Sequence, residues 1–242
     1  MGRVILATVD STNAEAGRLA PQVAGPVWIL AHEQTAGRGR RARAWASPRG
    51  NFHATLLLHP TEAADRVALR SFAAALALRE AFVALTGLPA AFALKWPNDV
   101  LLNGGKVAGI LLESAGQGGA VSHLAIGMGV NLIGAPDPSQ VEPGAVPPVS
   151  LLAETGMRVT PEAFLDALAP AYQRWEERLR DEGFAPLRAE WLAHAARLGE
   201  VIRARTGQQD REGVFQTIDD TGALILKQPQ GPVAIPAAEV FF

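Results

Sequence analysis

The residues best suited to chemistry form one basic segment, TAGRGRRARAW, which runs from Thr35 to Trp45. It contains four arginines, Arg38, Arg40, Arg41 and Arg43. Guanidinium groups form paired hydrogen bonds with carboxylates and phosphates, the glycines between them allow the loop to change conformation, and Trp45 offers a face for stacking. The whole chain has a formal net charge of -2, so this positive charge is local. Taken alone, the segment fits either a solvated basic face or a flexible clamp for a polyanion.

Polar residues also gather where a strand is expected to run into a helix. The segment DSTN, residues 10–13, follows an apolar run, and its hydroxyls and the first backbone N–H groups of the helix could bind a carbonyl or an anion. Plain helix capping explains the same residues, with Thr12 and Glu15 predicted to form a capping box.

A third polar group surrounds a proline turn. KWPND places Lys95, Asn98 and Asp99 within five residues, and Lys106 follows soon after in GGKVAGI, inside an apolar strand pattern. A buried lysine needs an anionic partner. The exposed face of an edge strand is an equally good reading of Lys106 from the sequence.

Two familiar phosphate-binding motifs are excluded. GGKV does not match a Walker A loop, because Val100 and Val107 occupy its first Gly and its Ser/Thr positions. GMGVNL has Gly127 and Gly129, but Leu132 stands where a dinucleotide fingerprint needs Gly or Ala.

The elements that must position these residues alternate between strands and helices. Short apolar runs predict strands at 4–9, 27–33, 51–59, 92–96, 99–102, 106–113 and 121–132. The first of these is expected to be buried, and Asn103–Gly105 to form a hairpin turn. Helices are predicted from residue 12, over 65–87, from Pro161 with Thr160 as N-cap, and over 187–199. Residues 134–148, with five prolines, predict an irregular loop.

From Leu198 onward the pattern changes to five short strands separated by GQQD, DDTG and QPQG. This spacing predicts a small antiparallel barrel.

Composition excludes several classes of protein. The 242 residues are 48% hydrophobic and 19% charged, which is typical of a globular protein. There is no cysteine, and the five histidines lack metal-binding spacing, so no metal site is predicted. No apolar run is long enough for a signal peptide or a membrane span. We therefore expect a cytoplasmic protein that does not bind a membrane.

Four motifs in this order resemble the biotin protein ligase (biotin–[acetyl-CoA-carboxylase] ligase) family. They are DSTN, EQTAGRGRRARAW, KWPNDVLLNGGKVAGILLE and GMGVNL, and the C-terminal strands extend the resemblance over essentially the whole chain. The resemblance implies an α+β fold. A mixed β-sheet flanked by helices, as in class II synthetases, would span residues 1–197, and an SH3-like barrel residues 198–242.

The resemblance also implies a two-step reaction. Biotin and ATP with Mg²⁺ would give biotinyl-5′-AMP and pyrophosphate, and a lysine of a biotin carboxyl carrier domain would then attack the mixed anhydride. The expected partners are the carrier, biotin and ATP, with no nucleic acid. A homodimer formed through an edge strand is left open.

Site residues follow from the motif positions. Biotin contacts are expected from Ser11, Thr12, Asn13, Gln34, Gly37, Arg38, Arg40, Lys106 and Gly109. Nucleotide contacts are expected from Arg40, Trp45, Asn98, Lys106 and Asn131. The residues expected to act in the chemistry are Arg38, Arg40, Lys106 and Asp99, with Asp99 orienting the incoming lysine amine. The loop from Thr35 to Gly50 is expected to be poorly ordered until the adenylate binds.

Two departures from the family pattern stand out. We call the loop from Thr35 to Gly50 the arginine loop. Ala42 stands where the family usually has a Gly in this loop, which affects how well the loop retains the adenylate. Only ten residues precede Ser11, so we expect no N-terminal DNA-binding domain.

Two alternative functions are open from the sequence. A lipoate or octanoate ligase or transferase shares the catalytic fold, although GRGRR…W with KWPND is the biotin-type pattern. A nucleic-acid-binding module would use the arginine loop and the terminal barrel. That barrel carries more acidic than basic residues, which disfavours the second alternative.

Overall fold

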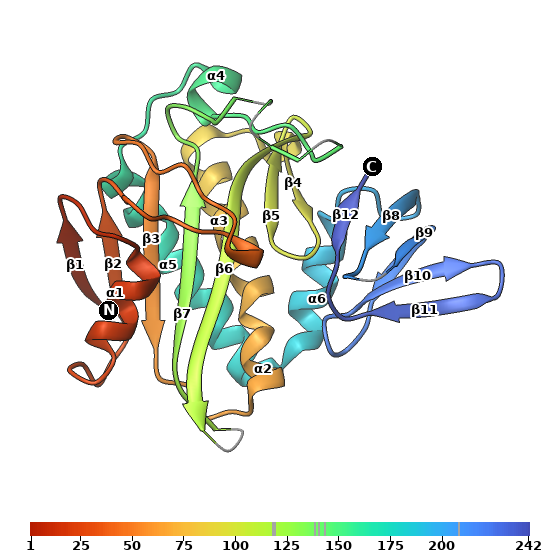
Figure 1. The fold of residues 1–242 in the computed structure, drawn as a ribbon, viewed down its shortest axis with the longest axis horizontal. Coiled ribbons are helices and arrows are strands. Elements are labelled where there is room, and N and C mark those ends of the chain that lie inside the picture. Colours follow the sequence, from red (N-terminus) through yellow and green to blue (C-terminus); the bar gives the residue numbers. More distant parts are fainter. Residues whose placement is uncertain (118–119, 138, 140, 143, 208) are drawn as a thin grey trace.

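A seven-stranded mixed sheet forms the centre of the computed structural model, which describes residues 1–117, 120–137, 139, 141–142, 144–207 and 209–242 (Figure 1). The strand order is β1-β2-β3-β7-β6-β5-β4. The strands are β1 Gly2–Leu6, β2 Val27–Ala31, β3 Phe52–Leu58, β4 Phe92–Lys95, β5 Asp99–Leu102, β6 Gly105–Gln117 and β7 Ala120–Val130. Only β1 and β2 are parallel, and the other neighbours are antiparallel.

Helices cover both faces of this sheet. On one face lie α2 (Ala64–Ala68), α3 (Arg70–Thr86), α5 (Pro161–Glu182) and α6 (Phe184–Ala193), whereas α1 (Thr12–Leu19) lies on the other (Figure 1). The short α4 (Leu151–Thr155) follows the 134–148 loop. Every residue of β3 is buried, because this central strand is covered on both sides. Because α1 packs mainly against β2, β3 and β7, the rest of this face of the sheet is left to carry a site.

Several local predictions are confirmed. Thr160 caps α5 by accepting a hydrogen bond from the Ala163 N–H, and Gly87 ends α3 in the left-handed conformation at φ 70°. Asn103 and Gly104, at φ 50° and 84°, form the predicted hairpin turn between β5 and β6.

Four predictions are wrong, one of them being the helix predicted over 187–199, which the structure places at Phe184–Ala193 (α6). The first strand covers residues 2–6 instead of 4–9, and it lies at the sheet edge with Ile5 52% exposed, because only β2 pairs with it. The capping box of α1 is absent, since Glu15 pairs with Arg18 and Thr12 bonds other residues. The helix predicted over 65–87 is divided into α2 and α3 at Leu69, whose N–H bonds the Arg66 carbonyl three residues back.

The C-terminal strands form a second sheet in the order β11-β10-β9-β8-β12, which confirms the five predicted strands. They are β8 Val201–Arg205, β9 Asp210–Ile218, β10 Leu224–Gln228, β11 Gly231–Ile235 and β12 Glu239–Phe241. Among the described residues the outer strands β11 and β12 do not pair, so the sheet is open. The Trp96 indole N–H, 3.0 Å from the Gly222 carbonyl, ties the two sheets together.

Parts of two predicted loops lie outside the described residues. These are positions 138, 140 and 143 of the 134–148 loop and position 208 of the turn before β9. Within the described residues, no helix has both the length and the apolar character that crossing a membrane requires.

Candidate active site

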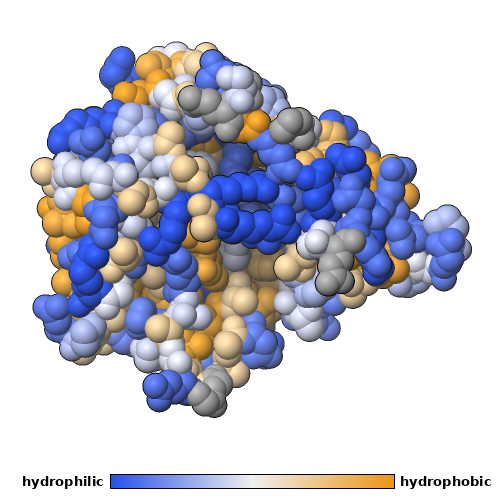
Figure 2. Space-filling view, in the orientation of Figure 1, coloured by the Kyte–Doolittle hydropathy of each residue, from blue (hydrophilic) through white to orange (hydrophobic). Residues whose placement is uncertain are grey.

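A cavity of about 910 Å³ opens on the α1 face of the sheet. Its walls come from the arginine loop, the 134–148 loop, the sheet and β12, and Figure 2 shows a hydrophilic band beside a hollow on this face. All the residues predicted for the site line it: Ser11, Thr12, Asn13, Gln34, Gly37, Arg38, Arg40, Trp45, Asn98, Asp99, Lys106, Gly109 and Asn131. The predicted residues, which lie up to 120 positions apart in the sequence, therefore meet at one site.

Strand register explains much of this convergence. Lys95, Asp99, Gly109, Gly129 and His53 are successive partners across β4, β5, β6, β7 and β3. Directly paired residues point to the same face of a sheet. This row therefore places two charged side chains beside two positions without side chains.

Trp45 lies over the two glycines of this row. A β-carbon added to Gly129 would lie 2.5 Å from the indole Cε2 and Nε1 atoms, and one added to Gly109 would lie 3.3 Å from Cζ3. The Lys106 ammonium is 5.4 Å from the centre of the Trp45 ring. The indole thus lies on a glycine floor, with the Lys106 ammonium within the range of a cation–π contact.

The first residues of α1 belong to a polar network. The Gln34 Oε1 atom accepts hydrogen bonds from the Thr12 N–H at 2.8 Å and the Thr12 hydroxyl at 3.0 Å. Gln34 donates to Ser47, and the buried Thr55 hydroxyl lies 2.6 Å from Asn13 Oδ1 and 2.8 Å from Thr12 Oγ1. Among the described contacts the Ser11 side chain makes no capping bond. Its hydroxyl is available to the cavity.

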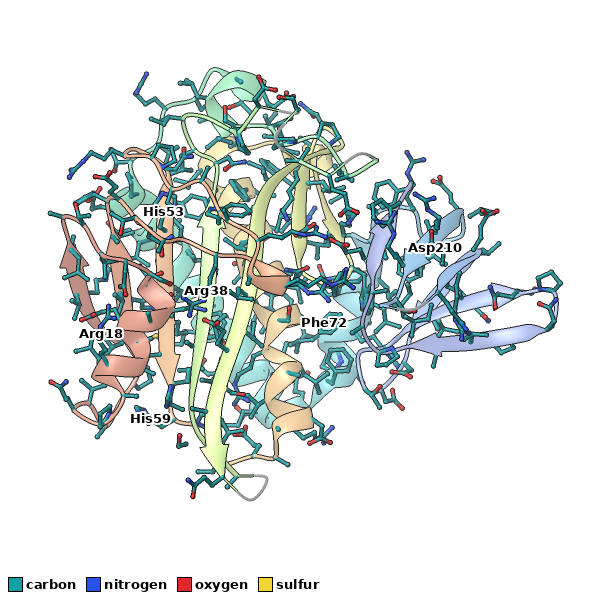
Figure 3. The ribbon with its side chains drawn as sticks, viewed as in Figure 1. Arg18, Arg38, His53, His59, Phe72 and Asp210 are labelled. Carbon is teal, nitrogen blue, oxygen red and sulfur yellow. The ribbon has the colours of Figure 1, made fainter. Side chains whose placement is uncertain are left out.

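Arg38 joins this network through Glu113. Its Nε and Nη2 atoms each lie 3.1 Å from a Glu113 oxygen, and Asn13 donates to the same carboxylate at 2.7 Å. Figure 3 shows Arg38 in front of the sheet. The arginine is held at the α1 end of the cavity.

The other arginines reach toward the C-terminal sheet. Arg40 donates to the Ala238 carbonyl at 3.1 Å, and Arg41 and Arg43 both pair with Glu239. Arg43 also contacts Glu142 of the 134–148 loop at 2.8 Å. We call this set of contacts the arginine clasp. The loop charge that lacks a carboxylate nearby in sequence finds its partners about 100 and 200 positions away.

Asp99 is the buried anion of the site. Its Oδ1 lies 2.7 Å from Lys106 Nζ and its Oδ2 lies 3.6 Å from Lys95 Nζ. Burial would raise the pKa of Asp99, but Lys106 and Lys95 outweigh it and hold that pKa below its usual value. Burial lowers the pKa of Lys95, against the opposing effect of Asp99. Asp99 therefore remains a carboxylate between two cations.

The two asparagines form part of the cavity wall. Asn98 Nδ2 donates to the Ile110 carbonyl at 2.6 Å, and Asn131 Nδ2 donates to the Val149 carbonyl at 3.1 Å. These bonds tie the turn before β5 to β6 and the end of β7 to the segment before α4. In each amide the Nδ2 group is already engaged with the backbone, and Oδ1 makes none of the described hydrogen bonds.

Sequence reasoning missed Glu113, Glu142 and Glu239, and it gave no site role to Gly127 or to Lys95, which it had placed in the polar turn. Lys95 has a signal, because it stands four positions before Asp99 across a tight turn. Gly127 leaves room for Asn13, which a β-carbon would displace. The three glutamates have no local signal, since each meets its arginine only through the fold.

No protein-based metal centre is evident. Among the described residues, no group of three or more His, Cys, Asp or Glu side chains could hold an ion. The carboxylates of the cavity, Asp99, Glu142 and Glu239, are each paired with lysine or arginine.

Family models match both sheets. Residues 2–131 match the biotin/lipoate A/B protein ligase family, and residues 198–242 match the biotin protein ligase C-terminal domain.

Individual relatives cover almost the whole chain. It is 60% identical to the biotin–[acetyl-CoA-carboxylase] ligase of Paracoccus denitrificans over 98% of this chain and 99% of that protein. It is 32% identical to the Mycobacterium tuberculosis enzyme of the same name, over 98% and 87% of the two chains. The structure of Aquifex aeolicus biotin protein ligase in complex with biotin and ATP superposes with a TM-score of 0.83 at 25% identity, covering 99% and 97% of the chains. The chain belongs to the biotin/lipoate A/B protein ligase family.

Proposed function

We propose that this protein is a biotin protein ligase. It activates biotin with ATP to biotinyl-5′-AMP and then transfers biotin to a lysine of the carrier domain of acetyl-CoA carboxylase or a related carboxylase. The 60% identity to a biotin–[acetyl-CoA-carboxylase] ligase along both whole chains carries the proposal. The convergence of every motif on one cavity supports it.

The neutral polar network is the binding site for the biotin ring. Ser11, Thr12, Asn13 and Gln34 offer hydroxyl and amide groups that match a ureido group, which has both donors and an acceptor. The backbone at Gly37 and Gly109 completes this end of the cavity. Thr12, Asn13 and Gln34 are already held by hydrogen bonds within this network, so the positions of their side chains are set before the ligand binds.

The nucleotide binds at the end of the cavity away from the polar network of α1. Trp45 offers a face to the adenine ring, and Asn98 and Asn131 supply polar groups in the wall beside it. Arg40 and Lys106 supply positive charge for the phosphates.

In the first step, a biotin carboxylate oxygen attacks the α-phosphorus of ATP, and pyrophosphate leaves with the electron pair of the broken P–O bond. The two anions repel each other, and negative charge develops on the α-phosphoryl oxygens. Arg38, Arg40 and Lys106 offset that charge, so positioning and electrostatic stabilisation supply the catalysis. Mg²⁺ enters with ATP as part of the substrate.

In the second step, the neutral amine of the carrier lysine attacks the carbonyl carbon of the mixed anhydride. The amide C–N bond forms as the bond between the acyl carbon and the AMP oxygen breaks, AMP leaves with that electron pair, and the proton lost by the amine passes to the AMP phosphate. Asp99 orients the amine through a hydrogen bond. Because its pKa is held low, Asp99 acts by orientation and charge more than as a strong base.

The arginine clasp limits access of water to the adenylate. It joins the arginine loop to the 134–148 loop and to the C-terminal sheet, so closure of the loop involves both predicted units, residues 1–197 and 198–242. A mixed anhydride survives only where water is excluded.

The partners follow from the reaction. The enzyme meets the carboxyl carrier, biotin and ATP in the cytoplasm, and nucleic acid has no role in the chemistry. An edge strand could pair two copies in a homodimer, and β1 is one of the strands that end a sheet in the described residues.

The test is pyrophosphate release with biotin and, separately, with lipoate, followed by addition of an apo carrier domain. We expect release that depends on biotin and the mass gain of one biotinyl group on one carrier lysine. Release with lipoate alone would assign the protein to the other branch of its family, and release with neither substrate would refute the proposal.

A further inference from the structure

The arrangement of lysines around Asp99 points beyond the residues predicted for the site. The chain has three lysines, Lys95, Lys106 and Lys227, and two of them contact the same buried carboxylate. They approach from opposite sides, because β5 lies between β4 and β6. Each lysine takes its own oxygen atom of Asp99.

The two contacts are unequal. Lys106 is closer, at 2.7 Å, but 28% of its side chain is exposed to the cavity. Lys95 is more distant, at 3.6 Å, and only 9% of its side chain is exposed. Lys106 can turn toward a ligand, whereas Lys95 is confined beside Asp99.

The proposed function, on which this inference rests, requires Lys106 to bind substrate oxygens. Its ammonium must then share or leave Asp99, and a buried carboxylate without a cation is strongly disfavoured. The other charged groups acting on this cluster are Arg40 of the arginine loop and, on Lys95, Glu239 of β12. Arg40 is itself expected to turn to the phosphates, so Lys95 is the cation left for Asp99.

We propose that Lys95 is a positioning residue: it holds Asp99 ionised and correctly oriented while Lys106 engages the biotin carboxylate and the α-phosphate. Asp99 thereby exchanges its principal partner from Lys106 to Lys95 during each catalytic cycle. The buried register pair between β4 and β5 provides the fixed point for this exchange.

The test uses the full-length protein with Lys95→Met, Lys95→Arg, Asp99→Asn and the double variant Lys95→Met/Asp99→Asn. Lys227→Met is the matched control, since it makes the same change at an exposed lysine of β10. Adenylate formation and transfer to the carrier are measured from about pH 4 to pH 9, with kcat and KM separated, so that the range extends toward the usual pKa of an aspartate.

We expect Lys95→Met to lower kcat by about tenfold or more, with a smaller effect on KM for biotin, because a charged contact to Asp99 is lost. The acid limb of its pH profile should move to higher pH, since Asp99 is then easier to protonate. Lys95→Arg should restore the wild-type acid limb. In the Asp99→Asn background, Lys95→Met should have little further effect.

Three outcomes would overturn the inference. They are an unchanged acid limb in Lys95→Met, an equal loss of kcat from Lys95→Met with or without the Asp99 carboxylate, and an acid limb in Lys95→Arg that is shifted as far as the one in Lys95→Met. If Lys95→Met does not fold, Lys95→Gln, which keeps a polar side chain without the charge, takes its place and is judged by the same shift of the acid limb. An inactive wild-type protein would instead refute the proposed function.

Discussion

The Trp45 indole lies against the backbone of Gly129, so close that a β-carbon there would be 2.5 Å from the ring. Gly129 thus has a role in the site even though its GMGVNL segment fails as a dinucleotide motif. Its backbone provides a flat surface on the sheet against which an aromatic ring can pack, and Gly109 on the neighbouring strand extends that surface. A flat ring can lie on this floor only because neither residue has a side chain.

Gly129→Ala should therefore displace Trp45 from the floor. The new methyl group would meet the indole ring, which is rigid, so the loop residue has to move. We expect a weaker ATP interaction, with KM for ATP raised by about tenfold, the equivalent of about 1.4 kcal/mol of lost binding. Steady-state kinetics and the change in tryptophan fluorescence on ATP addition measure these effects.

Gly134→Ala is the matched control, because a β-carbon there would meet no atom within 4 Å. It should leave KM for ATP and the fluorescence response as in the wild type. If Gly129→Ala also left both unchanged, the floor would have no role in seating Trp45 or the nucleotide.

The sequence predicts the elements of the fold better than their contacts. Gly87, Thr160 with Pro161, and Asn103–Gly104 are local signals, because capping and turn geometry depend on neighbouring residues. Whether the first strand is buried depends on which strand pairs with it, and sequence patterns do not contain that information. The capping box failed for the same reason, since Gln34 lies 22 positions away and takes the Thr12 groups that a cap would use.

In the cavity too, the sequence predicts the residues of each motif but not the contacts between distant segments. Its motifs point to their own residues, and those residues line one cavity. Glu113, Glu142 and Glu239 contact the arginines only after β6, the 134–148 loop and β12 have taken their places. Long-range ion pairs of this kind leave no spacing pattern to detect.

Glu239→Gln should loosen the arginine clasp. The carboxylate pairs with Arg41 and Arg43, and the amide keeps its shape but loses its charge. We expect trypsin to cleave the arginine loop about tenfold faster and the adenylate to escape faster, because charge-assisted bonds are the stronger ones. Glu212→Gln, at an exposed position on β9, is the control. Equal cleavage of wild type and Glu239→Gln would contradict the clasp.

The ion pairs of Glu239 with Arg41 and Arg43 also predict that protease cleavage of the arginine loop depends on pH. Burial would raise the pKa of Glu239, but Arg43, Arg41 and Arg40 outweigh it and lower that pKa. A lowered acid pKa means that the clasp is fully present above the ordinary range of a glutamate and is lost as the pH falls through the lowered value. Loop cleavage by an acid-active protease should therefore rise at low pH in the wild type and stay flat in Glu239→Gln.

The buried His53 side chain is expected to make the free energy of unfolding depend on pH, independently of the arginine clasp. Burial lowers its pKa to about 4, while its contact with the Pro48 carbonyl acts in the opposite direction. The unfolded chain then binds a proton more readily, so stability falls between about pH 6.5 and pH 4 by about 3 kcal/mol. His53→Gln should remove this slope in urea unfolding followed against pH. The same slope in wild type and variant would contradict the assignment.

Ala42 and Ala44 offer a matched pair within the arginine loop. Both are exposed, but Ala42 has a φ of 57°, in the left-handed region that favours glycine, whereas Ala44 is not among the residues with positive φ. Ala42→Gly should relieve strain of about 1 kcal/mol in the clasped loop, partly offset by greater freedom of the open loop. Ala44→Gly has no strain to relieve and should only favour the open loop.

Trypsin cleavage measures the difference, because neither substitution adds or removes an arginine. We expect Ala42→Gly to slow cleavage of the loop about two- to fivefold and Ala44→Gly to accelerate it by a similar factor, the equivalent of less than about 1 kcal/mol in each direction. Bound adenylate should reduce cleavage in all three proteins, with the smallest reduction in Ala42→Gly. Faster cleavage in both variants would mean that the left-handed turn at Ala42 contributes no strain to the closed loop.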